Sequence, residues 1–123
     1  MKLGDTFLLH TSASRFIRHL YVVISDPAKN AGNFIAVNIT GDRFRTGEEC
    51  VLDAGDHPWI KKKSFVAFAD ALEITPAHDR RLQKLIVSKK IVLQPSVSSE
   101  VLERIVTAAK VSTAIAENYK KYL

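Results

Sequence analysis

Four side chains that can bind a ligand or exchange protons lie in two neighbouring apolar segments of the sequence. His19 and Tyr21 alternate with the aliphatic residues of one segment, and Asn38 and Thr40 alternate with those of the next. Successive side chains of a β-strand point to opposite faces, so the four polar groups share one face if the aliphatic residues point to the core. The pattern predicts either a site on a rigid sheet or a simply solvated face.

Histidine is the side chain best suited to proton transfer near neutral pH, and a second histidine lies in a marked context. His57 precedes Pro58, which keeps it extended, and it is followed by Trp59 and three consecutive lysines. The lysines that could hold phosphate are Lys61, Lys62 and Lys63. Two interpretations stay open for His57: a general acid or base, or part of a surface turn anchored by Trp59.

Two predicted loops interleave arginine with phenylalanine. The residues concerned are Arg15, Phe16 and Arg18 in the first loop, and Arg43, Phe44 and Arg45 in the second. Arginines neutralise backbone phosphates, and aromatic rings stack on bases, so the mixture is typical of a nucleic-acid-binding surface. A solvated loop with its ring tucked inward fits the same pattern.

The composition indicates one soluble, cytoplasmic domain. A chain of 123 residues can bury a core without disulfides, and the lone Cys50 has no partner within it. No signal peptide and no apolar run of membrane-spanning length is recognised. No cysteine–histidine cluster has metal-binding spacing, so neither metal nor cofactor is expected. The net charge of +5 favours a polyanionic partner.

Apolar periodicity places the secondary structure. Strands are expected within 3–9, at 19–25, 34–40 and 50–52, and over 64–74 as a strand pair or one strand bent at Asp70. A helix over 80–90 and a short strand ended by Pro95 follow, then a final helix capped by Ser96 or Ser98 and reaching Lys120 and Lys121. The expected fold is mainly β: a small, strongly curved barrel over 1–75 with a helical part over 76–123. Motifs of kinases, dehydrogenases, triad hydrolases and metalloproteases are absent from the sequence.

The order and spacing of several short motifs then become informative. They are Gly4-Asp5, HLYVVISDP at 19–27, VNIT at 37–40, CVL at 50–52, GDHPWIK at 55–61 and SFV at 64–66. Over residues 3–74 the chain resembles the MazF/PemK-like toxins of type II toxin-antitoxin pairs, and most of all their divergent PemK-like branch. The resemblance implies an SH3-like barrel that forms a homodimer, is held inactive by an antitoxin protein and cleaves single-stranded RNA without a metal.

The family's catalytic pair is only partly matched. Thr40 corresponds to its threonine or serine at the end of the third strand, whereas His19 stands where the family has an arginine, and Leu20 replaces the following proline. Arg18 lies one position earlier. Three alternatives stay open: His19 has taken over proton transfer, Arg18 reaches into the site, or the site is no longer catalytic.

Metal-free RNA cleavage needs a base, an acid and cations beside the phosphate. His19 and His57 are candidates to share the proton transfers, with Arg18 and one of the three lysines holding phosphate and Thr40 orienting it. The leading hypothesis is therefore a toxin endoribonuclease that leaves a 2',3'-cyclic phosphate. The alternatives are a non-catalytic SH3-like module that binds nucleic acid or protein and, more weakly, a DNA-binding regulator.

Overall fold

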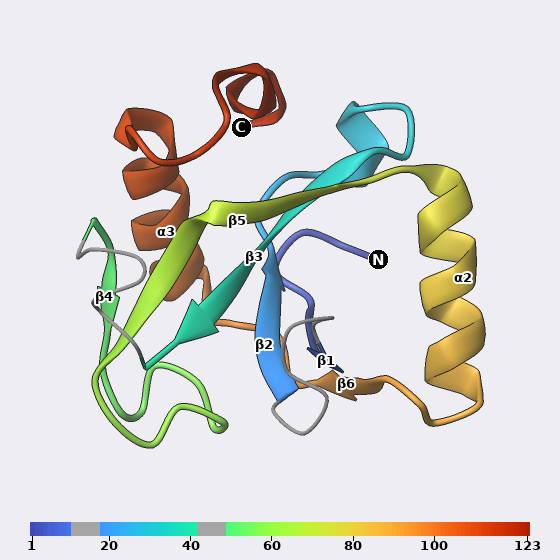
Figure 1. Cartoon of the computed structure of the whole chain (residues 1–123), viewed down its shortest axis with the longest axis horizontal. Coiled ribbons are helices and arrows are strands. Elements are labelled where there is room, and N and C mark those ends of the chain that lie inside the picture. The colour runs from blue at the N-terminus through green and yellow to red at the C-terminus, as the bar shows by residue number, and fades with distance from the viewer. Residues whose placement is uncertain (11–17, 42–48) are drawn as a thin grey trace.

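The chain folds into one antiparallel sheet with a helix on each side, as a computed structural model shows (Figure 1). The structure describes residues 1–10, 18–41 and 49–123. The strands are β1 (Thr6–His10), β2 (Arg18–Val23), β3 (Phe34–Thr40), β4 (Val51–Leu52), β5 (Ser64–Ile74) and β6 (Val92–Gln94), in the spatial order β4-β5-β3-β2-β1-β6. The helices are η1 (Pro27–Lys29), α2 (Pro76–Val87), α3 (Ser99–Val111) and η2 (Glu117–Tyr122).

The centre of the sheet is buried on both faces. Alternate residues of β2 and β3 belong to a first core beneath α3, which includes Leu20, Val22, Ile35, Val37, Ile39 and Ile105. The residues between them belong to a second core beneath α2, which includes Phe7, Tyr21, Val23, Phe34, Ala36 and Ile74. The predicted alternation is confirmed, and each face is covered by a different helix.

The helix α2 covers its face of the sheet only in part. Its N-cap is Thr75, whose Oγ1 accepts a hydrogen bond from the His78 amide, and Pro76 occupies the first turn. Leu82, Leu85 and Ile86 pack against the second core, yet no residue of the helix is fully buried. The members of the second core are buried, but Leu9 and Leu72 beside it stay partly exposed next to the helix.

One long strand carries the irregularity that the sequence predicts at Asp70. In the pairing of β3 with β5, Ala36 lies opposite Leu72 and Asn38 opposite Ala67, so Val37 alone faces the residues 68–71. The extra residues form a bulge, which bends the strand, and Asp70 within it is exposed. The 64–74 segment is thus one bent strand and not a pair.

The C-terminal helix is shorter than the sequence predicts. Ser98, one of the two expected residues, is its N-cap, but the helix ends at Val111, and Lys120 and Lys121 lie in the separate helix η2. The Ser112 hydroxyl donates to Glu49 Oε1 at 2.7 Å and accepts hydrogen bonds from the amides of Ala114 and Ile115. These bonds turn the chain at Ser112, and the expectation of one helix to the terminus was wrong.

The first core is closed by contacts between α3 and the β4 region. Arg104 donates to the Val51 carbonyl at 3.0 Å and to the Asp56 carboxylate at 3.2 Å.

The mainly β architecture is the predicted one, a curled sheet compatible with a small barrel. Within the described ranges, no helix is long and apolar enough to cross a membrane.

Candidate functional site

The candidate site lies where three strand ends meet on the α2 side of the sheet. Because β2 and β5 both run antiparallel to β3, the start of each lies beside the end of β3. His19 is the second residue of β2, and Thr40 is the last residue of β3, where it pairs with Phe65 of β5. Both polar side chains are partly exposed. This region is called the polar end below.

Two of the three predicted phosphate-binding lysines reach the polar end. A Cβ atom at position 41 would lie 3.0 Å from Cε and 3.3 Å from Nζ of Lys62, so this lysine lies across the backbone directly after Thr40. The Lys63 ammonium is 5.8 Å from the centre of the Phe65 ring, the residue paired with Thr40. Lys61 is also exposed in the same loop.

Tyr21 and Asn38 form the buried floor of the polar end. They are directly paired across β2 and β3, and they are only 3% and 5% exposed, so the four polar side chains do share a face but half of them are not solvated. Burial raises the pKa of Tyr21 above its usual 10.0, hydrogen bonding by Asn38 opposes the rise, and the Asp70 carboxylate adds to it. The carboxamide oxygen of Asn38 is buried without a hydrogen-bond partner in the described part of the chain.

Of the arginines and loop aromatics predicted to bind RNA, the structure describes only Arg18. Arg18 is the first residue of β2, opposite His10 of β1, and so belongs to the sheet and not to the preceding loop. The other five residues lie outside the described part of the chain: Arg15, Phe16, Arg43, Phe44 and Arg45.

His57 lies on the other face of the sheet from His19. It is 2% exposed, and its Nδ1 accepts a hydrogen bond from the Trp59 amide at 3.0 Å. The proton of the neutral ring therefore sits on Nε2, which lies 2.7 Å from the Pro95 carbonyl and 3.2 Å from the Thr6 hydroxyl. Thr6 points to the same side of β1 as Leu8, a member of the first core. The structure thus does not bring the two histidines together.

An apolar groove beside the polar end was not predicted from the sequence. It lies between α2 and the sheet, encloses about 270 Å³, and is lined mainly by Phe7, Leu9, Leu72, Ile74, Leu82 and Leu85. This groove is called the α2 groove below. Its signal in the sequence is the alternation of Leu72 and Ile74 followed by Leu82 and Leu85 at helical spacing, but their convergence depends on how α2 packs.

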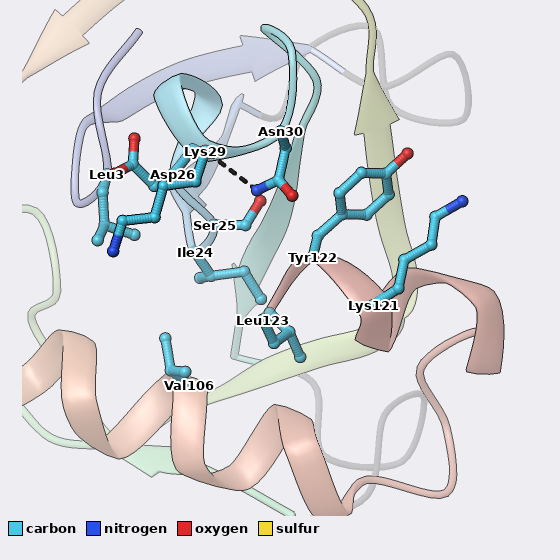
Figure 2. A pocket seen from close by; sticks show the side chains of 10 residues that line it. All are labelled: Leu3, Ile24, Ser25, Asp26, Lys29, Asn30, Val106, Lys121, Tyr122 and Leu123. Atoms are coloured by element: carbon cyan, nitrogen blue, oxygen red, sulfur yellow. Dashed lines mark hydrogen bonds between the residues drawn. The ribbon is translucent and has the colours of Figure 1, made fainter.

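A second depression lies far from the polar end, between η1, α3 and the C-terminal residues (Figure 2). Its floor is apolar, formed by Leu3, Ile24, Val106 and Leu123, while Asp26 and Lys29 lie at its edge. The Asn30 side-chain Nδ2 donates to the Asp26 carbonyl at 2.9 Å, drawn as the dashed line. The Ser25, Asp26 and Asn30 side chains are hydrogen-bonded to the backbone, and the Tyr122 hydroxyl donates to Glu73, so these polar groups of the pocket already have partners.

Comparison with known proteins leaves the family open. No protein-family model matches the sequence, and no curated protein matches it significantly. Among the described residues, no group of three or more histidine, cysteine, aspartate or glutamate side chains could hold a metal ion. The geometry of the polar end is therefore the basis for a functional hypothesis.

The buried hydrogen bonds of His57 predict a structural role. The change His57→Ala removes the acceptor of the Trp59 amide and the donor to the Pro95 carbonyl, so we expect the free energy of unfolding to fall by about 1–3 kcal/mol. Urea denaturation measures it. The exposed His78 is the control, since His78→Ala should change stability by no more than about 0.5 kcal/mol. Equal effects of the two changes would contradict this role.

The raised pKa of Tyr21 predicts a loss of stability at high pH. The neutral phenol is favoured in the folded chain, so its contribution is complete below the unfolded pKa and disappears as the pH rises through the raised folded pKa. The wild type should therefore lose more stability above pH 10 than Tyr21→Phe does, measured by urea denaturation from pH 8 to 11. Parallel curves for the two proteins would refute the prediction.

Proposed function

We propose that the chain is an endoribonuclease that cleaves single-stranded RNA without a metal ion, as a MazF/PemK-like toxin with an SH3-like barrel. In this proposal it is cytoplasmic, acts as a homodimer and is held inactive by an antitoxin protein. The supporting observation is the convergence of a partly exposed histidine, the Thr40 hydroxyl and two lysines at one end of a sheet. These groups match the needs of RNA transesterification: a proton acceptor beside donors and cations for the phosphate.

The proposed reaction assigns each group a part. His19 takes the proton of the ribose 2'-hydroxyl, and the 2'-oxygen attacks phosphorus while the bond to the leaving 5'-oxygen breaks. The products are a 2',3'-cyclic phosphate and a 5'-hydroxyl, whose proton comes from solvent. Lys62, Lys63 and Arg18 stabilise the charge on the pentacovalent phosphorus, and Thr40 donates to a phosphate oxygen. His57 has no part in this scheme because it is buried on the other face.

The second candidate is a non-catalytic module that binds RNA at the same place. The burial of His57 favours it, because only His19 of the two histidines proposed for proton transfer then lies at the polar end. The two candidates differ in turnover and not in binding surface. A cleavage assay therefore separates them.

Cleavage should persist when divalent cations are removed. We expect the purified protein to cut a mixed pool of single-stranded RNA in EDTA and to leave 2',3'-cyclic phosphate ends, because protein side chains supply the proton acceptor and the cations in this scheme. Denaturing gels and end-group analysis provide the measurement. Cleavage only with added Mg²⁺ would refute the mechanism, and RNA binding without cleavage would favour the module.

Substitutions at the polar end distinguish proton transfer from phosphate binding. His19→Ala should reduce the cleavage rate by about 10²–10⁴-fold and leave RNA affinity nearly unchanged. Arg18→Ala should weaken affinity and reduce the rate less, since a fixed cation positions phosphate but does not transfer protons. Thr40→Val removes the hydroxyl and keeps almost the same side-chain shape, so it tests the part of the hydroxyl in the reaction.

The control for loss of a positive charge is Lys110→Ala, at an exposed lysine of α3. This change should leave the cleavage rate and the RNA affinity at wild-type values. Melting temperatures must match for the comparison to count. If Arg18→Ala abolished cleavage while His19→Ala left it intact, Arg18 and not His19 would fill the place of the family arginine.

A further inference from the structure

The α2 groove continues directly from the polar end. Leu9 in the groove lies opposite His19, and paired residues of neighbouring antiparallel strands are about 4.5–5.5 Å apart. Phe7, also in the groove, stacks on Tyr21 with a ring-centre distance of 5.6 Å. On the β5 side, Leu72 pairs with Ala36, two residues before Asn38. A ligand bound at His19 and Thr40 therefore meets the groove next.

The groove presents accessible apolar surface. Leu72 is 39% exposed although it lies in a strand, and Leu9, Leu82 and Leu85 are only partly buried. A volume of about 270 Å³ falls below the 300–1,000 Å³ of pockets for drug-sized ligands. The space suits one planar ring system rather than a helix or a long extended peptide.

The charge around the groove is positive. Arg81 and His78 line the groove, and Glu73 also borders it, but the Glu73 carboxylate is engaged by the Tyr122 hydroxyl, which donates to it at 2.7 Å. Residues 76–90 carry five arginines and lysines and one aspartate, a formal charge of +4 against +5 for the whole chain. Asp79 is engaged by the Met1 ammonium and by Gln83, so it does not offset Arg81.

We infer that the α2 groove binds the nucleobase next to the phosphodiester held at the polar end, with Arg81 contacting the RNA backbone beyond it. The inference rests on the proposed function and adds a subsite that contributes sequence preference. An apolar slot with a cationic rim fits a base and its phosphate, because the base stacks on apolar side chains while the guanidinium pairs with the anion. Continuity with the polar end and the small volume favour this occupant over an acidic peptide with aliphatic anchors.

The first test compares two neighbouring arginines. Arg81 lines the groove, whereas Arg80 is exposed on the same helix and does not. With single-stranded RNA in EDTA, Arg81→Ala should reduce kcat/KM about tenfold, the value of one charge-assisted contact. It should also lower the slope of log affinity against log salt by about 0.7. Arg80→Ala should change kcat/KM less than about twofold. Arg80 does not line the groove, and solvent and salt largely screen an exposed cation that does not contact the RNA.

The second test fills the groove. Leu72→Trp should abolish the base preference at the position adjacent to the cut bond, measured by sequencing products from a randomised RNA pool. Val111→Trp, at a 77% exposed site of α3, is the matched control and should keep the wild-type preference. Arg81→Ala keeps the test decisive if Leu72→Trp fails to fold.

The outcomes separate this inference from the proposed function. If the wild type cuts RNA but both groove variants behave like their controls, the groove is not a base subsite and the ribonuclease stands. Binding of a synthetic peptide of alternating glutamate and leucine, lost in Leu72→Trp without any change in RNA cleavage, would instead make the groove a peptide site. If the wild type neither cuts nor binds RNA, both proposals fail.

Discussion

The structure depends on the burial of one sheet from both sides. β3 pairs with β2 and β5, and its residues from Phe34 to Ile39 are no more than 5% exposed, so each face of the strand needs a cover. α3 provides one cover through Val101, Ile105 and Ala109, which are all buried. α2 provides the other without burying any residue completely. Leu9 and Leu72 stay partly exposed beside α2 and line the α2 groove, so the groove follows from how α2 packs on the second core.

The sequence predicted those features that depend on local periodicity. The alternation in β2 and β3, the shared face of His19, Tyr21, Asn38 and Thr40, and the Ser98 cap can each be inferred from a short window and are present in the structure. The bend at Asp70 is also found, as a bulge over residues 68–71.

The features that sequence did not predict depend on partners far along the chain. α3 ends at Val111 because Ser112 bonds to Glu49, 63 residues earlier. His57 is buried because its ring bonds to Thr6, 51 residues earlier, and to Pro95, 38 residues later. Tyr21 is covered by its stack on Phe7 and by the packing of α2, which no periodicity specifies. The strand pattern in the sequence thus predicted the residues of the polar end, while tertiary packing determines which of their side chains are accessible to solvent.

The hydrogen bonds around Pro95 also constrain the order of folding. The Pro95 carbonyl accepts from the Thr6 hydroxyl at 2.7 Å, across 89 residues, and β6 is the strand that pairs with the outer edge of β1. Such distant pairings are slow to form and, during synthesis, must wait for the later segment. A nascent chain that ends before residue 92 has its β1 edge unpaired and the His57 ring without its acceptor. The chain must therefore have left the ribosome as far as Pro95 before the sheet that carries the polar end can be completed.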